Sequence, residues 1–215
     1  MKLAIFDLDG TLLDTLDDLT DAINAMLATV GYPMKDREEV RKIVGSGKYR
    51  LIKDCLPKNI NESELERCIS IYSIIYDGMG SPRTKVFAGL EKVIPELKKR
   101  GYRTAILSNK PQESTNIVYE KYLKEYGFDM VFGQSERIKC KPDPSGALYI
   151  IDKAGVLPND VFFIGDGETD VMTALNAGVN CVGVLWGNRT ETELRAVGCE
   201  TFAKTPKDLL DILPE

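Results

Sequence analysis

The order of apolar and polar positions divides the chain into three stretches. Residues Leu3 to Leu8 form a short apolar run that is typical of a buried strand. Between Asp14 and Gly80 the apolar residues recur at helical spacing, so we expect only helices in this stretch. From Pro82 onward, helical patterns alternate with short apolar runs. This order indicates a helical segment inserted after the first strand of an α/β chain.

Capping sequences and glycines separate the helices of the inserted stretch. Pairs of capping residues three positions apart open two of them, and a Gly-Ser-Gly break at 45–47 separates two others. The helices that we expect are Leu16–Val30, one that the Asp36/Glu39 capping box opens and that runs through Val44, Lys48–Leu56, and one that Asn61 and Glu64 cap and that carries Leu65 to Tyr76.

Strands and helices alternate in the third stretch, which predicts right-handed βαβ units and a parallel sheet covered on both faces. A proline at position 95 lies inside one expected helix and should kink or shorten it. The expected strands are Thr104–Leu107, Met130–Phe132, Val161–Gly165 and Cys181–Leu185. The expected helices are Leu90–Arg100, Gln112–Tyr126, Pro144–Ala154, Asp170–Ala177, Thr190–Val197 and Pro206–Leu213.

The fold class that follows is α/β, a Rossmann-like parallel-sheet core with an inserted all-helical cap. We expect residues 1–14 and 82–215 to form the core and residues 15–81 to form the cap. A chain of 215 residues with 43% apolar and 28% charged residues is long enough for this arrangement and ordinary in composition for a globular protein.

Charge and residue usage exclude several classes of function. The net charge is −5 with no strongly basic stretch, so nucleic acid is not the expected partner. No stretch approaches the ~20 apolar residues that span a bilayer, and the N-terminal apolar run is too short for a signal peptide. We therefore expect a cytoplasmic protein with no membrane partner and five reduced cysteines. The absence of histidine excludes a Ser-His-Asp triad and His-ligated zinc.

Polar side chains gather directly after the predicted strands. Asp7 and Asp9 follow the first strand, Ser108 follows the next, and Asp166 and Asp170 follow a third. The carboxyl ends of parallel strands line one crevice, where ligands bind in open α/β sheets. Converging carboxylates repel one another unless a cation lies among them, and Mg²⁺ prefers carboxylate and phosphate oxygens. A magnesium site at this edge of the sheet is the expectation.

With these residues in place, the chain resembles the haloacid dehalogenase-like hydrolase superfamily, and within it the phosphoglycolate phosphatase-like group with a helical cap. Its four motifs occur in order, and the resemblance covers essentially the whole chain. The motifs are Asp7-Leu8-Asp9-Gly10-Thr11-Leu12, Leu107-Ser108-Asn109-Lys110, Lys141-Pro142-Asp143-Pro144 and Gly165-Asp166-Gly167-Glu168-Thr169-Asp170.

The resemblance implies a role for each matching residue. Asp7 would be the nucleophile, and Asp9 would be the general acid and then the general base. Ser108 and Lys141 would bind the transferring phosphoryl group, assisted by backbone amides at Gly10 and near Asn109. The implied magnesium ligands are Asp7, Asp166 and the backbone carbonyl of Asp9, with Asp170 completing or supporting the shell. The acidic residue at Asp9 favours phosphate chemistry over dehalogenation.

Substrate selection is expected to fall mainly to the cap. Lys48 and Arg50 follow the Gly45-Ser46-Gly47 break and could meet an anionic group such as a carboxylate, with Lys110 on the core side as the next candidate. Solvated surface cations are an equally weighted interpretation of Lys48 and Arg50. The cap tyrosines and Trp186 are interpreted as packing residues.

The function that this sequence predicts is magnesium-dependent hydrolysis of a small phosphorylated metabolite by a monomer or homodimer. Phosphomutase and pyrophosphatase activities are alternatives on the same fold. The cap decides between a phosphatase and a phosphomutase, and its sequence carries no clear sugar-binding pattern. A catalytically silent binding protein is the alternative from another class, because a fold does not fix a function. The intact set of Asp7, Asp9, Lys141 and Asp166 argues against it.

Overall fold

A six-stranded parallel sheet forms the centre of the larger part of the molecule. The computed structural model describes residues 1–215. Strand β1 lies in the middle of the sheet and pairs with β4 and β6, and all neighbouring strands are parallel. In spatial order the strands are β5 (Met130–Gln134), β4 (Tyr102–Pro111), β1 (Lys2–Phe6), β6 (Val161–Gly165), β7 (Asn180–Val184) and β8 (Phe202–Ala203). The predicted Rossmann-like α/β fold is confirmed.

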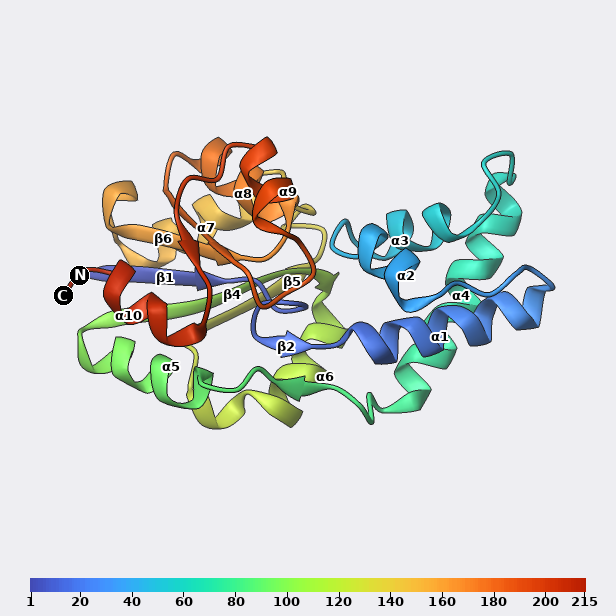
Figure 1. Ribbon diagram of the computed structural model, residues 1–215, viewed down its shortest axis with the longest axis horizontal. Helices are drawn as coiled ribbons and strands as arrows, with labels where there is room; N and C mark the ends of the chain where they lie inside the picture. The colour runs from blue at the N-terminus through green and yellow to red at the C-terminus, as the bar shows by residue number, and fades with distance from the viewer.

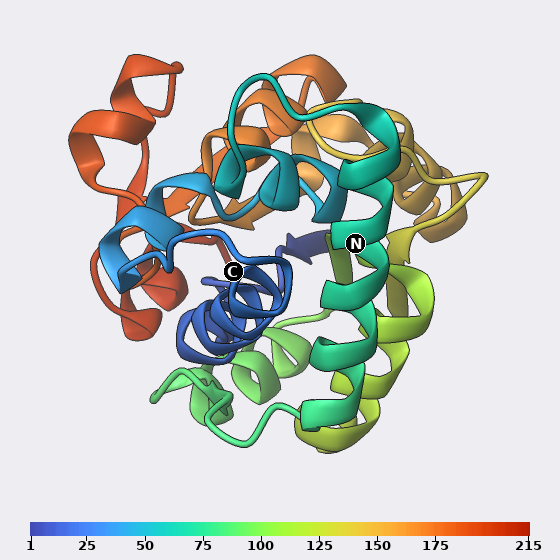
Figure 2. The same cartoon turned by 90° about the vertical axis from the view of Figure 1, so that its right-hand side faces the viewer.

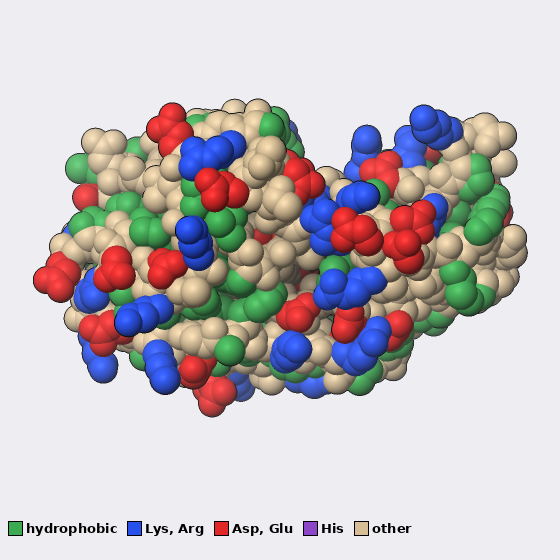
Figure 3. All heavy atoms as spheres, viewed as in Figure 1, with side chains coloured by type: hydrophobic (Ala, Val, Ile, Leu, Met, Phe, Trp, Pro, Cys, Tyr) green, Lys and Arg blue, Asp and Glu red, His purple; other side chains and the backbone are tan.

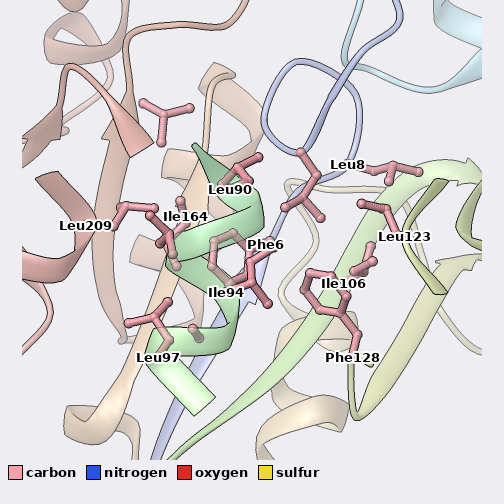
Figure 4. Packing of buried hydrophobic residues seen from close by; sticks show 14 of the residues in the cluster. Phe6, Leu8, Leu90, Ile94, Leu97, Ile106, Leu123, Phe128, Ile164 and Leu209 are labelled. Carbon is pink, nitrogen blue, oxygen red and sulfur yellow. The ribbon is translucent and has the colours of Figure 1, made fainter. Parts of the chain in front are cut away.

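Alternating side chains of β1 enter the two apolar layers on either face of the sheet. Ala4 and Phe6 belong to the layer beneath helices α5 (Leu90–Lys99), α6 (Gln112–Tyr122) and α10 (Leu209–Ile212), part of which Figure 4 shows. Leu3 and Ile5 belong to the opposite layer, beneath α7 (Ser145–Ala154) and α8 (Glu168–Ala177). Burial on both faces explains why β1 is apolar throughout instead of alternating.

The second part of the molecule is a bundle of four helices on one side of the sheet's carboxyl edge (Figures 1 and 2). It packs around an apolar core of its own, formed by residues between Leu16 and Tyr76. The Asp36/Glu39 capping box and the Asn61 cap form as the sequence predicts. The helices are α1 (Leu16–Val30), α2 (Arg37–Ile43), α3 (Lys48–Cys55) and α4 (Glu62–Met79). Residues 15–81 are the proposed cap, and residues 1–14 and 82–215 are the proposed core.

A two-stranded antiparallel ribbon at the chain crossings joins the cap to the core. Strand β2 (Leu13–Asp14) pairs with β3 (Lys85–Val86). Beside it, buried Asp18 accepts hydrogen bonds from the backbone N–H groups of Arg83 and Thr84. The sequence analysis did not predict this ribbon, because two-residue strands leave no periodic pattern.

Several predicted elements differ from the structure at their ends. Helix α5 continues through Pro95 to Lys99, so Pro95 does not shorten it, and the kink stays a prediction. Leu90, Val93 and Ile94 bury an apolar face that offsets one lost backbone hydrogen bond. The helix predicted to reach Tyr126 ends at Tyr122 and is followed by the 3₁₀ turn Lys124–Tyr126. Strand β4 extends beyond the predicted Thr104–Leu107, and the short edge strand β8 was not predicted.

The surface carries mixed charges, and the molecule narrows where its two parts meet. Figure 3 shows Lys and Arg side chains interspersed with Asp and Glu over both parts, and a hollow between them. The two ends of the chain lie side by side (Figure 1), with the Lys2 ammonium donating to the Pro214 carbonyl at 3.1 Å. None of the helices is both long and apolar enough to span a bilayer.

Candidate active site

The predicted catalytic residues meet at the carboxyl edge of the sheet, where it faces the cap. Asp7 directly follows β1, and its backbone N–H donates to the Ile164 carbonyl of β6 at 2.9 Å, which fixes the start of the loop. Ser108 lies in the neighbouring strand β4, and Asp166 directly follows β6. Lys141 reaches the same point from the loop before α7. Sequence positions 134 residues apart are thus brought into contact.

A buried lysine bridges two carboxylates at the centre of this site. The Lys141 ammonium donates to Asp7 Oδ1 and to Asp170 Oδ1, both at 2.6 Å. All three residues are buried, with Lys141 only 3% exposed. Burial alone would lower the pKa of Lys141, but Asp170 and Asp7 raise it above its ordinary value. The lysine therefore stays charged and holds Asp7 in one orientation.

Asp166 is held by two donors in a tight backbone setting. The Thr11 hydroxyl donates to its Oδ1 at 2.9 Å, and the backbone N–H of Asn188 donates to its Oδ2 at 2.7 Å. Gly10 has φ +92°, and a Cβ there would lie 2.2 Å from Asp166 Oδ2; a Cβ at Gly187 would lie 2.3 Å from Asp166 Cβ. Only glycine fits these two positions without displacing the carboxylate.

The carboxylates of Asp7 and Asp166 carry more negative charge than their surroundings neutralise. Burial first, and then Asp170, raises the pKa of Asp7 well above its ordinary value despite the contact with Lys141. The same two causes raise the pKa of Asp166 to about 6. Two neighbouring carboxyl groups with raised pKa values indicate a site where a bound cation would stabilise the ionised carboxylates.

The donor set fits a hard divalent cation. Asp7, Asp166 and Asp170 each offer an oxygen within 4.8 Å of the others. Asp9 Oδ1 is buried without a hydrogen-bond partner, so the site also holds an unsatisfied acceptor. Oxygen ligands alone, with no histidine in the chain and no cysteine in this cluster, match Mg²⁺ and not zinc. The residues present therefore fit a magnesium ion.

Not every oxygen of the cluster is free for a ligand. Asp170 Oδ2 accepts from the Gly167 backbone N–H at 2.9 Å, while its Oδ1 contacts Lys141. Both Asp170 oxygens therefore already have partners, and its supporting place in a metal site stays a prediction. A Cβ at Gly165 would lie 2.3 Å from the Asp170 side chain, so the approach of α8 to β6 also depends on glycine.

The two polar residues after Leu107 are used differently. Ser108 is 3% exposed, lines the cleft and accepts from the Lys110 backbone N–H at 3.1 Å, with its own hydroxyl proton left for another acceptor. The Asn109 side chain accepts from the Lys141 backbone N–H at 2.6 Å and donates to the Gly45 carbonyl at 2.9 Å. The Asn109 side chain thus ties Lys141 and the cap to β4, which leaves only its backbone for phosphate binding.

A cleft between core and cap opens over these residues. Its core wall includes Asp7, Asp9, Ser108, Asn109 and Lys110. Its cap wall includes Gly45, Gly47, Lys48, Tyr72, Ser73 and Tyr76. A cleft of this kind, with a charged floor and an aromatic wall, suits a small polar ligand.

Lys110 connects the floor of the cleft to the cap. Its side chain is 7% exposed, and its ammonium lies 3.3 Å from Asp9 Oδ2 and 3.0 Å from the Tyr76 hydroxyl. Burial alone would lower its pKa, but Asp9 and Tyr76 raise it. Tyr72 stacks on Tyr76 with ring centroids 5.6 Å apart. Both tyrosines pack in the cap and also line the cleft, so interpreting them only as packing residues was incomplete.

The structure separates the two cations predicted for the cap. Lys48 lines the cleft, and its ammonium donates to the Ser73 hydroxyl at 2.8 Å. Arg50 does not line the cleft; its side chain is 64% exposed and pairs with Asp54 at 2.9 Å. The two side chains point to nearly opposite sides of α3, since two residues correspond to little more than half a helical turn. Arg50 is the surface cation of the two.

Sequence reasoning missed several residues that complete the site. Thr11, Asn188 and Arg189 were given no role and Tyr76 only a packing role, although the structure brings all four to the cleft edge or to the carboxylate cluster. Asn188 and Arg189 follow β7, the strand beside β6, so their position after a strand end was an available signal. Trp186 donates to the Thr11 carbonyl at 3.0 Å and anchors the same loop.

Comparisons with known proteins agree with this geometry. A family model described as haloacid dehalogenase-like hydrolase matches residues 4–184. Phosphoglycolate phosphatase 1 from Pseudomonas aeruginosa is 32% identical over 218 residues, which cover 99% of this chain and 79% of that protein. A phosphoglycolate phosphatase from Pseudomonas syringae pv. tomato is 33% identical with the same coverage.

A solved structure is similar over the same extent. The crystal structure of a candidate phosphoglycolate phosphatase from Lactobacillus delbrueckii subsp. bulgaricus matches with a TM-score of 0.92 at 27% identity, covering 99% of each chain. The chain therefore belongs to the haloacid dehalogenase-like hydrolase family, in which the relatives it matches are phosphoric monoester hydrolases.

Proposed function

We propose that this hydrolase is a magnesium-dependent phosphatase that acts on a small phosphorylated metabolite resembling phosphoglycolate. The observation that carries the proposal is the pair Asp7 and Asp9 on the floor of the cleft, with Lys141 held 2.6 Å from Asp7 Oδ1. A nucleophile, an acid–base group and a charge-neutralising lysine are the three parts that phosphoryl transfer through a covalent intermediate requires.

In the first step Asp7 attacks phosphorus and the ester oxygen departs. A bond forms between the Asp7 carboxylate and phosphorus, the bond from phosphorus to the substrate oxygen breaks, and Asp9 donates a proton to that oxygen. Lys141 and the Ser108 hydroxyl bind the equatorial phosphoryl oxygens, where charge is concentrated. The fixed position of Lys141 between Asp7 and Asp170 supports this assignment.

In the second step water hydrolyses the aspartyl-phosphate. Asp9, now ionised, accepts a proton from the water that attacks phosphorus, and Asp7 leaves as a carboxylate together with inorganic phosphate. The Asp9 Oδ2 atom lies 3.3 Å from the Lys110 ammonium, and this ion pair fixes the position of the Asp9 side chain on the floor of the cleft.

Asp7, Asp166 and the backbone carbonyl of Asp9 are the proposed magnesium ligands, with Asp170 in support. The ion, when bound, neutralises charge between an anionic nucleophile and an anionic phosphate. Thr11 and the Asn188 backbone keep Asp166 oriented toward the cluster. The raised pKa values of Asp7 and Asp166 support a cation at this place.

The cleft favours a second anionic group at a short distance from the phosphate. Lys48 and Lys110 supply two buried or half-buried cations on its walls, and the cleft between them leaves space for a small molecule. The named activity of the matched Pseudomonas relatives, phosphoglycolate phosphatase, points to the same kind of substrate. A substrate with one CH2 group between its phosphate ester oxygen and its carboxylate, as in phosphoglycolate, satisfies both observations.

Lys48→Met tests this substrate assignment. We expect KM for phosphoglycolate to rise roughly 10–100-fold, since a hydrogen bond to a charged group contributes about 1.5–3 kcal/mol. KM for p-nitrophenyl phosphate, which lacks the carboxylate, stays nearly constant. Arg50→Met is the matched control from the same helix and leaves both values unchanged.

A panel of phosphorylated metabolites, assayed with the purified wild-type protein, separates the remaining functions. Release of inorganic phosphate from small carboxylated esters supports the proposal. Conversion of a sugar phosphate to its isomer identifies a phosphomutase, preferential cleavage of pyrophosphate identifies a pyrophosphatase, and no turnover of any substrate identifies a binding protein. Equal effects of Lys48→Met on both substrates contradict the carboxylate assignment.

A further inference from the structure

A buried arginine of the core lies against the end of a cap helix, outside the proposed catalytic set. Arg189 follows strand β7 and is 8% exposed. Its guanidinium donates to three cap carbonyls: Arg41 at 2.5 Å, Lys42 at 3.1 Å and Val44 at 3.0 Å. Its remaining donor, Nε, pairs with Glu168 at 2.8 Å. Each nitrogen of the side chain therefore has a partner.

The three carbonyls belong to the last turn and C-cap of α2. At this end of a helix the carbonyl groups have no backbone N–H partner within the helix. The C-terminal end of a helix also carries partial negative charge, which favours a cation. A planar guanidinium with five donors can satisfy several carbonyls at once, whereas an ammonium is a point charge. Arg189, which belongs to the proposed core, thus supplies hydrogen-bond donors and a positive charge to the end of a helix in the proposed cap.

The contact is reciprocal and continues into the loop over the cleft. Arg41 of the cap donates to the Asn188 carbonyl of the core. The Gly45 carbonyl, directly after the helix end, accepts from the Asn109 side chain at 2.9 Å and from the Thr169 hydroxyl at 3.4 Å. Gly45 and Gly47 have φ +112° and +84°, so this loop needs glycine to take the path that meets the core.

On the core side the same residues adjoin the carboxylate cluster. Asn188, next to Arg189, donates its backbone N–H to Asp166. Glu168, the ion-pair partner of Arg189, is the first residue of α8 and lies between Asp166 and Asp170 in the sequence. Arg189 is therefore connected to the proposed metal-binding residues through one or two intervening residues.

We infer that Arg189, with Glu168, is a positioning latch that holds the cap closed over the active site and links closure to the arrangement of the Asp166 loop. The inference rests on the proposed function for its kinetic consequence alone. The β2–β3 ribbon, which has only two residue pairs, lies where the chain passes between core and cap. When the cap lifts, the α2 carbonyls and the guanidinium exchange their mutual contacts for water.

Hydrogen–deuterium exchange of the whole protein tests the latch without reference to activity. We expect Arg189→Met to raise the exchange rate of amides in residues 41–51 about tenfold or more, because local opening becomes more frequent, while the core strands keep their protection. Arg189→Lys keeps the charge without the fork and restores protection only in part. Arg67→Met, an exposed cap arginine that pairs with Glu64 at 3.2 Å, is the control and leaves exchange unchanged.

Steady-state kinetics of the same variants test the positioning role. Arg189→Met lowers kcat/KM for phosphoglycolate and for p-nitrophenyl phosphate alike, by about tenfold, because both substrates need the closed cap. This differs from Lys48→Met, which discriminates between the two. Glu168→Ala loses one anchor of Arg189, shows the same two effects at smaller size, and serves as the second variant if Arg189→Met does not fold.

The outcomes separate clearly. Unchanged exchange in residues 41–51 overturns the latch. Faster exchange across the whole chain with a lower unfolding temperature shows a general structural role and also overturns it. Faster local exchange with unchanged kcat/KM overturns the positioning role. If the protein hydrolyses no phosphate ester at all, the proposed function fails while the exchange measurement still decides the latch.

Discussion

Asp7→Asn abolishes turnover, with a loss of roughly four orders of magnitude or more, as is usual when a covalent nucleophile is removed. The amide cannot form the bond to phosphorus that the first step requires, while Lys141 keeps Asp170 as a partner at 2.6 Å and the fold is retained. Phosphate release from p-nitrophenyl phosphate, measured under saturating Mg²⁺, checks the result. Activity within tenfold of wild type contradicts a nucleophilic Asp7.

The matched variant Asp9→Asn separates the two aspartates. It retains the nucleophile and loses proton transfer, for which we expect a loss of turnover of roughly 10²–10⁴-fold.

Thermal unfolding of the metal-free protein serves as the control for folding. Asp7 has a folded pKa raised by burial and by Asp170, so its ionised form destabilises the fold at neutral pH. We therefore expect the unfolding temperature of Asp7→Asn to be no lower than that of the wild-type protein. Its inactivity is then attributed to the lost chemical step and not to unfolding.

Chelation of divalent cations removes activity completely, and this is the second large effect. Without a cation, Asp7 and Asp166 lie beside Asp170 with Lys141 as the only neutralising group. EDTA therefore reduces phosphate release to background, and Mg²⁺ restores it. Ca²⁺ does not restore it, since its longer bonds and higher coordination number misplace the nucleophile. Full activity in EDTA contradicts the proposed site.

The pH dependence of metal binding provides an independent control. The folded pKa of Asp166, about 6, is raised above its ordinary value, so this group stabilises the metal-free fold most at low pH. That contribution is lost as the pH rises through about 6. Mg²⁺ binds the ionised carboxylates, so it should raise the unfolding temperature more at about pH 7 than at about pH 5. Equal increments at the two pH values, with KCl matching the ionic strength, contradict the assignment.

The sequence predicts most of this arrangement because the governing patterns are local. Apolar runs such as Val161–Gly165 locate the strands of a parallel sheet, and the residue after each run must then lie at the carboxyl edge. Asp7, Ser108 and Asp166 come together for that reason alone. The helical spacing between Leu16 and Val30 predicts the first cap helix to the residue.

What the sequence does not predict depends on contacts between distant segments. The position of Arg189 after a strand end points to the carboxyl edge of the sheet but does not predict its contacts with the cap, because its acceptors are carbonyls 145–148 residues away. The same holds for Arg50 and Lys48, whose places on the surface and in the cleft follow from how α3 packs on α4. Helix α5 tolerates Pro95 because its apolar face is buried, which propensity alone does not show.

A rapid-quench experiment with a ³²P-labelled substrate tests the central claim most directly. The wild-type protein is mixed with labelled substrate and Mg²⁺, stopped in acid within a single turnover, and digested for peptide mapping. We expect acid-stable, hydroxylamine-sensitive label on the peptide that contains Asp7, and none in Asp7→Asn. Label on Ser108 or on any cysteine, or turnover without labelled protein, would contradict the aspartyl-phosphate mechanism.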